Sequence, residues 1–149
     1  MSPLIPADSR LLNRLLATTF SLLSLSALPA FASPRISEFM AVNDSTILDE
    51  DGDSPDWIEI YNPAEDNTWL NLAGYALSDD PLFAKKWLFP TTSIAPGTRI
   101  IVFASGKNRS VAGAELHTNF SLDKDGEYLV LVAPDGNTIL TVFDPYPEQ

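Results

Sequence analysis

The stretch EYLVLVAPDGNTILTVF, residues 127–143, carries the clearest structural signal in the chain. Its first half is rich in branched and aromatic side chains, which favour a β-strand. Pro134-Asp135-Gly136-Asn137 follows and is typical of a tight turn. Residues 138–143 are again largely apolar and run back as the partner strand, so the stretch predicts a β-hairpin.

Short apolar runs of the same kind, separated by turn residues, continue toward the N-terminus as far as Arg35. Residues 35–42, 56–61 and 99–104 are the clearest of them. The last run is nearly all apolar, as in a central strand covered on both faces, so Ile101→Asp is expected to be strongly destabilising. Strands at intervals of about ten residues, with turns between them, are typical of antiparallel sandwiches and barrels, and we expect a sandwich.

Alternation within two of these runs predicts which side chains share a face of the sheet. Ile36 and Phe39 are expected on opposite faces of the first strand. Ile58 and Ile60 are expected on one face of the next strand, with Trp57 on the other.

Further motifs follow one another in a definite order between these runs. They are ISEFMA at residues 36–41, DWIEIYN at 56–62, LAGYALSDD at 72–80, WLFP at 87–90, IVFASG at 101–106 and HTNFSL at 117–122. Over residues 35–143 this succession resembles the bacterial branch of the lamin tail domain family. The resemblance implies an immunoglobulin-like β-sandwich that acts as a non-catalytic module in larger secreted or surface proteins.

Residues 1–32 have the layout of a signal peptide. Arg10 and Arg14 supply positive charge, an apolar run over residues 15–28 follows, and Ala30-Phe31-Ala32 resembles a small-x-small cleavage site. The apolar run is shorter than the roughly 20 residues of a comfortable membrane span. A buried N-terminal helix and an uncleaved anchor are the alternatives. The layout favours cleavage after Ala32, and we therefore expect a secreted or cell-surface protein with no membrane insertion after cleavage.

Composition narrows the class of protein and its partners. The chain has 149 residues and 45% hydrophobic residues, which suits one folded domain with a sizeable core. Its formal net charge of −11 disfavours nucleic acid as a partner. It has no cysteine, which excludes disulfides and zinc sites that need sulfur.

These features divide the chain into three parts. Residues 1–32 are expected to be the signal peptide and residues 33–143 the β-sandwich domain. Residues 144–149, with Pro145 and Pro147, resemble the start of a linker or a truncated C-terminal end. We therefore expect the chain to be the N-terminal part of a larger extracellular protein.

An acidic loop over residues 44–56 is the strongest candidate for a metal site. Asp49, Asp51 and Asp53 alternate around Gly52, so a curled loop can direct three carboxylates at one hard cation. Calcium prefers about six to eight oxygen ligands at such a site. The spacing departs from that of the EF-hand, so the pattern favours a solvated acidic turn, and calcium bound by Asp49, Asp51 and Asp53 is the functional alternative.

The remaining candidates for chemistry are the only histidine and the three tryptophans. His117 has no Gly-x-Ser-x-Gly elbow to accompany it, so we expect a structural hydrogen-bonding role. Trp57 and Trp87 are expected in or beside the core, and Trp69 is expected to be exposed.

No acid, base and nucleophile can be grouped from the sequence, so we expect no enzymatic activity. The expected function is a secreted or cell-surface interaction module whose partner is a protein or a matrix component. The alternative is a carbohydrate-binding module attached to a secreted enzyme, with exposed aromatic side chains that bind a glycan.

Overall fold

The computed structural model describes residues 33–65 and 67–149, so the expected signal peptide lies outside the described residues. No helix in the described part of the chain is long and apolar enough to cross a membrane. The described residues form ten strands: β1 Arg35–Met40, β2 Asp56–Tyr61, β3 Leu70–Asn71, β4 Ala76–Ser78, β5 Trp87–Leu88, β6 Ser93–Ile94, β7 Arg99–Ala104, β8 Leu116–His117, β9 Leu129–Val132 and β10 Ile139–Phe143.

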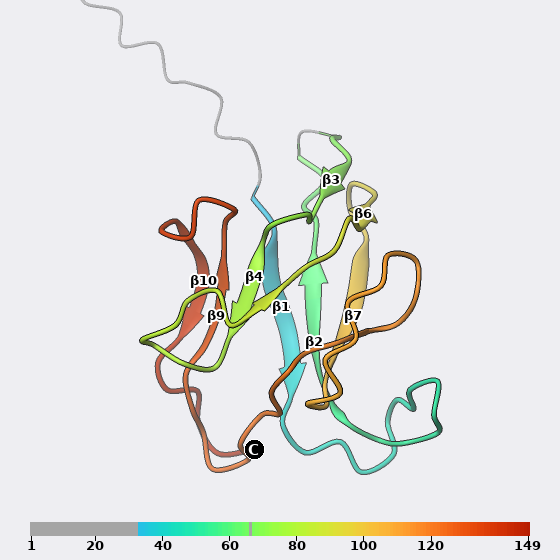
Figure 1. The fold of residues 1–149 in the computed structure, drawn as a ribbon, viewed down its shortest axis with the longest axis vertical. Coiled ribbons are helices and arrows are strands. Elements are labelled where there is room, and N and C mark those ends of the chain that lie inside the picture. Colours follow the sequence, from blue (N-terminus) through green and yellow to red (C-terminus); the bar gives the residue numbers. More distant parts are fainter. Residues whose placement is uncertain (1–32, 66) are drawn as a thin grey trace, which may run out of the picture. The chain divides into compact units, whose positions relative to one another are not determined.

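Eight of these strands form two four-stranded sheets (Figure 1). The first sheet has the order β1-β2-β7-β8 and the second has the order β10-β9-β4-β5, while β3 and β6 pair separately. The described strand pairs are antiparallel except for β7 and β8, which run parallel. The all-β sandwich expected from the sequence is therefore confirmed, as is the β9–β10 hairpin across residues 134–137.

The hydrophobic core is built from the alternate residues of both sheets. Ile58 and Ile60 of β2 are fully buried in it, and Leu77 and Leu131 of the second sheet belong to the same cluster. Trp57 is also buried but lies outside this cluster, which agrees with its expected place on the opposite face of β2. The edges of the two sheets are joined where the backbone N–H of Ile36 donates to Thr141 Oγ1 at 3.1 Å.

A β-bulge in β1 changes the faces expected for that strand. Ile36 pairs with Ile60, whereas Glu38 pairs with Glu59, so the register shifts between the two pairs. Because the extra residue reverses the alternation, Ile36 and Phe39 both contact the core. Their expected separation onto opposite faces was wrong, since simple alternation does not anticipate a bulge.

Strand β7 is central in the first sheet, but its two faces are not equally buried. Val102 is fully buried and belongs to the core cluster, while Ile101 is only partly buried. Ile101 pairs with Glu59 of β2, whose side chain is also partly exposed. The expected deep burial of Ile101 was therefore wrong. A charged side chain is expected to destabilise the domain more at Val102 than at Ile101.

Residues 144–149 pack against the domain and do not have the character of a linker start. Tyr146 is almost completely buried within the core cluster, with its ring centroid 4.8 Å from that of Phe39. Its hydroxyl donates to the carbonyl of Asp123 at 2.9 Å. The Gln149 side chain accepts the backbone N–H of Ala41 at 2.9 Å. The packed domain thus extends beyond the expected boundary at residue 143, because a buried aromatic anchors the segment.

Candidate functional site

The acidic loop folds around the side chain of Asp49. Its Oδ1 accepts the backbone N–H groups of Asp51 and Asp53, each at 3.0 Å. Gly52 lies at the tip with a φ of 81°, a left-handed conformation that glycine adopts readily. The Asn43 side chain fixes the loop base by donating to the carbonyls of Ile47 and Pro55, each at 2.8 Å. The loop is therefore rigid, and Asp49 Oδ2 is left free to bind another group.

The three predicted ligands converge, and the group at their centre is the ammonium of Lys107. Its Nζ lies 2.5 Å from Asp49 Oδ2, 2.7 Å from Asp51 Oδ2 and 2.8 Å from Asp53 Oδ2. Lys107 belongs to the loop between β7 and β8, so these ion pairs hold two loops together. In the described structure a basic side chain thus occupies the position in which the sequence suggested calcium. Calcium binding stays a prediction, and in the native chain it requires the ion to displace Lys107.

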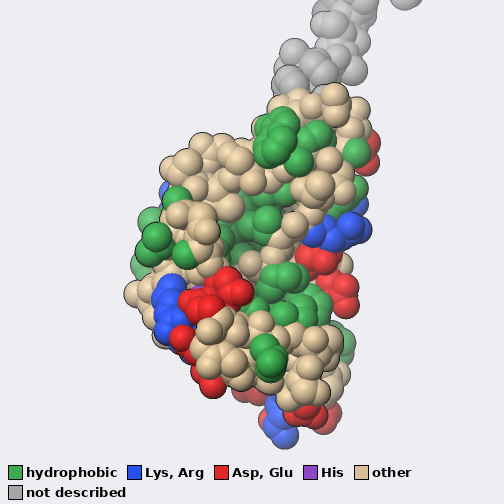
Figure 2. Space-filling model, turned by 90° about the vertical axis from the view of Figure 1, so that its right-hand side faces the viewer, with side chains coloured by type: hydrophobic (Ala, Val, Ile, Leu, Met, Phe, Trp, Pro, Cys, Tyr) green, Lys and Arg blue, Asp and Glu red, His purple; other side chains and the backbone are tan. Residues whose placement is uncertain are grey.

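The basic side chains also set the charge state of the cluster. The Arg109 guanidinium, followed by the Lys107 ammonium, lowers the pKa of Asp51 to about 2. Burial alone would raise the pKa of Asp49, but hydrogen bonds from Lys107 and from the loop backbone lower it. The three aspartates in turn raise the pKa of Lys107. Asp49, Asp51 and Lys107 are therefore charged at neutral pH. Figure 2 shows basic side chains directly beside acidic ones on the surface.

Lys107→Met should convert this ion-pair cluster into a calcium site. In the native chain a calcium ion must displace the ammonium, so we expect calcium to leave the melting temperature nearly unchanged. In the variant the three aspartates repel one another, and a bound cation relieves that repulsion and stabilises the fold by mass action. Thermal melts with millimolar calcium and with a chelator provide the measurement, and Lys124→Met is the control. Equal responses of the native chain and of Lys107→Met would show that the aspartates do not bind calcium.

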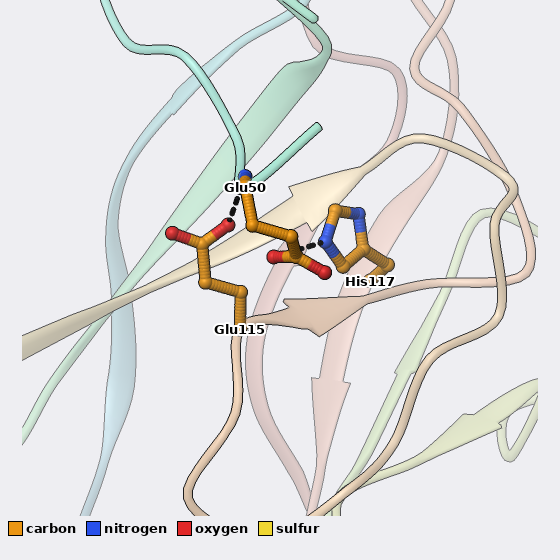
Figure 3. A group of neighbouring side chains, drawn as sticks. All are labelled: Glu50, Glu115 and His117. Atoms are coloured by element: carbon orange, nitrogen blue, oxygen red, sulfur yellow. Dashed lines mark hydrogen bonds and ion pairs between the residues drawn. The ribbon is translucent and has the colours of Figure 1, made fainter. Parts of the chain in front are cut away.

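A second group of side chains lies beside the first and consists of Glu50, Glu115 and His117 (Figure 3). Glu50 belongs to the acidic loop, whereas Glu115 precedes β8 and His117 ends it. The Glu50 carboxylate lies between the other two side chains, with its Oε2 3.3 Å from His117 Nε2. Glu115 Oε2 accepts the backbone N–H of Glu50 at 2.7 Å.

The pKa values of the two carboxyl groups are shifted in opposite directions. The hydrogen bond with Glu115, together with the Arg109 guanidinium, lowers the pKa of Glu50 to about 2. The side-chain hydrogen bond with the Glu50 carboxyl raises the pKa of Glu115, whereas the backbone N–H of Glu50 lowers it by a smaller amount. Glu50 is therefore the permanent anion of the group, held by Arg109 Nη1 at 2.6 Å from its Oε1.

His117 is held in one orientation from both sides of its ring. It is 0% exposed and stacks on Phe103, with centroids 5.2 Å apart. Nδ1 lies 2.9 Å from Ser105 Oγ, which also accepts the backbone N–H of Lys107 at 3.2 Å. These contacts connect β7, β8 and the acidic loop, and they are the hydrogen bonds that the expected structural role of His117 requires.

The tryptophans divide as the sequence predicted. Trp57 and Trp87 are buried, and Trp69 is 67% exposed. The ring contacts found in the described structure pair Trp87 with Phe89 and give Trp69 no aromatic neighbour.

Sequence reasoning located the three aspartates but missed their partners. Lys107, Arg109 and Glu115 were not among the residues that the sequence singled out. Both Lys107-x-Arg109 and Glu115-x-His117 place two side chains on one face of an extended segment, and each pair faces the acidic loop. That alternate spacing is the signal that could have indicated them.

Comparisons with known proteins bear on the fold as a whole. The family model described as Lamin Tail Domain matches residues 29–144. No significant match is found among curated proteins or among solved structures.

Proposed function

Because the chain belongs to the lamin tail domain family, a non-enzymatic family with an immunoglobulin-like fold, we propose that it is a binding module of a secreted or cell-surface protein. Its partner is a protein or a matrix component.

The observation that carries the proposal is an apolar pair at the tip of the turn between β4 and β5. Leu82 is 95% exposed and Phe83 is 57% exposed. Neighbouring large apolar side chains that stand in solvent are typical of interaction surfaces. Leu88 of β5, a strand at the edge of the second sheet, is exposed as well.

The turn that presents this pair is held rigidly by the domain. Ser78 is fully buried, and its hydroxyl donates to the carbonyl of Phe83 at 2.8 Å and also lies 3.1 Å from the carbonyl oxygen of Asp80. Asp80 Oδ1 accepts the backbone N–H of Leu82 at 2.8 Å. A preordered turn loses little conformational entropy on binding, which raises the affinity that two apolar side chains can supply.

The charge of the chain indicates the chemistry of the partner. The net charge of −11 favours a partner with a basic surface, and the exposed side chains of Leu82 and Phe83 require an apolar pocket within that surface. We therefore propose a protein partner that receives Leu82 and Phe83 in such a pocket.

Photo-crosslinking from the turn tests this proposal. A photoreactive phenylalanine analogue at Phe83 should capture one partner from the surface of producing cells, and the same analogue at Val111, which is 64% exposed on another loop, should not. Leu82→Ser should abolish the capture without changing the melting temperature. Capture from both positions, or capture that survives Leu82→Ser, would contradict the proposed surface.

The carbohydrate-binding alternative depends on Trp69. Glycan-binding faces commonly stack sugar rings on aromatic side chains, and Trp69 is exposed enough to do so. A glycan array distinguishes the two functions: binding that is lost in Trp69→Ala but kept in Leu82→Ser would favour the glycan.

Secretion is the part of the proposal that rests on residues 1–32. Their charged, apolar and small-residue segments support export followed by cleavage after Ala32. N-terminal sequencing of the exported chain should therefore begin at Ser33, and retention of the uncleaved chain inside the cell would contradict secretion.

A further inference from the structure

We propose that Glu50, Glu115 and His117 bind a divalent transition-metal ion of the Zn²⁺ type. This inference does not depend on the proposed function. Each of the three side chains offers a ligand atom, and these atoms lie within 4.8 Å of one another. One imidazole nitrogen with two carboxylates is a donor set that suits zinc and its neighbours, whereas calcium and magnesium prefer oxygen alone.

The distance between His117 and Glu50 fits a shared metal better than a direct ionic hydrogen bond. Nε2 and Oε2 are 3.3 Å apart, whereas charge-assisted hydrogen bonds prefer about 2.7–2.9 Å. In a tetrahedral shell with metal–nitrogen and metal–oxygen bonds of about 2.0–2.2 Å, two ligand atoms lie about 3.3–3.6 Å apart. The pair is therefore already spaced as two neighbouring ligands.

Neighbouring side chains fix the orientation of His117 and Glu50, as groups outside the ligand shell do in metal sites. Ser105 Oγ contacts His117 Nδ1 at 2.9 Å. When this nitrogen carries the proton and donates it to Ser105, the Nε2 lone pair is directed toward the carboxylates. Arg109 binds Glu50 Oε1 at 2.6 Å, which leaves Oε2 facing the histidine.

The site has one buried ligand and two exposed ones, so an ion can reach it from solvent. His117 is fully buried and fixed by its stacking on Phe103, while Glu50 and Glu115 are exposed. Three protein ligands leave a fourth position for water, as in open metal sites. The neighbouring aspartate cluster differs, because the Lys107 ammonium already lies among its carboxylates.

Titration of the full chain with Zn²⁺ alone, followed by calorimetry, tests the site. The native chain should bind one ion per chain, and Glu115→Gln should weaken binding at least tenfold. Ser105→Ala should weaken it by roughly 10- to 100-fold, as expected when a group that orients a ligand is lost. Asp53→Asn, which changes the neighbouring cluster, is the matched control and should bind as the native chain does.

Cobalt provides a readout that does not depend on stability. Co²⁺ bound to the native chain should give the visible absorption of a low-coordinate site, and Glu115→Gln should lose it. Absence of saturable Zn²⁺ binding would overturn the proposal, as would native affinity in Glu115→Gln. Loss of binding in Asp53→Asn but not in Glu115→Gln would place the ion among the aspartates and would equally overturn it.

Discussion

A chain that ends at Phe143 is expected to be less stable than the full chain by about 3 kcal/mol or more, the usual cost of deleting a buried aromatic side chain. The deletion removes Tyr146, which is almost completely buried between the sheets and contacts Phe39. It also removes the hydroxyl group that bonds both the N–H and the carbonyl of Asp123. Urea denaturation monitored by tryptophan fluorescence measures the loss.

Two further variants separate this packing from the hydrogen bonds at the chain end. A chain that ends at Pro147 keeps Tyr146 and loses the two hydrogen bonds of Gln149, with Ala41 and Lys124, each worth about 1 kcal/mol. Gly126→Ala should destabilise the full chain, because Gly126 has a φ of 95° and an added Cβ would collide with the carbonyl oxygen of Tyr146. Equal stability of the chains ending at Phe143 and at Gln149 would show that the segment is not part of the core.

Val102→Asp should unfold the domain or destabilise it by more than about 4 kcal/mol, because it places an unpaired charge among buried side chains. Val102 is fully buried and pairs with Ile58 on one side and Leu116 on the other. Ile101→Asp, at the adjacent and partly exposed position, should remain within the usual range of about 0.5–3 kcal/mol.

Circular dichroism and chemical denaturation of the two variants give a direct comparison. If Ile101→Asp is as damaging as Val102→Asp, the side chain of Ile101 is buried and the two faces of β7 are equivalent. If Val102→Asp folds with nearly native stability, the core described between the sheets is wrong.

The fold could be predicted because its information is local. The turn at residues 134–137 and the alternation in β2 each identify an element without reference to the rest of the chain. The faces of β1 could not be predicted, because the bulge between Ile36 and Glu38 depends on pairing with β2. The docking of Tyr146 depends on contacts with Phe39 and Asp123, which are remote in the sequence.

In the candidate site, too, local features could be predicted and contacts between distant segments could not. Asp49, Asp51 and Asp53 could be predicted to converge, because a short loop with Gly52 at its tip brings them together. The position of Lys107 could not, because it depends on how the loop after β7 lies against the acidic loop. The charges of the residues do not indicate which basic side chain pairs with which acidic one. The contact between Glu50 and His117 likewise forms only when the first sheet is assembled.

The central claim is that the domain binds a protein through the apolar turn at Leu82 and Phe83. The most direct test uses the partner that crosslinking identifies, purified in its free form. It measures the affinity of that partner for the native chain and for two variants. The double variant Leu82→Ser, Phe83→Ser should bind at least about tenfold more weakly, as expected when central apolar anchors are lost. Val111→Ser, at an exposed apolar position on a different loop, should bind with native affinity. If the partner binds the double variant as tightly as the native chain, this turn is not the binding surface.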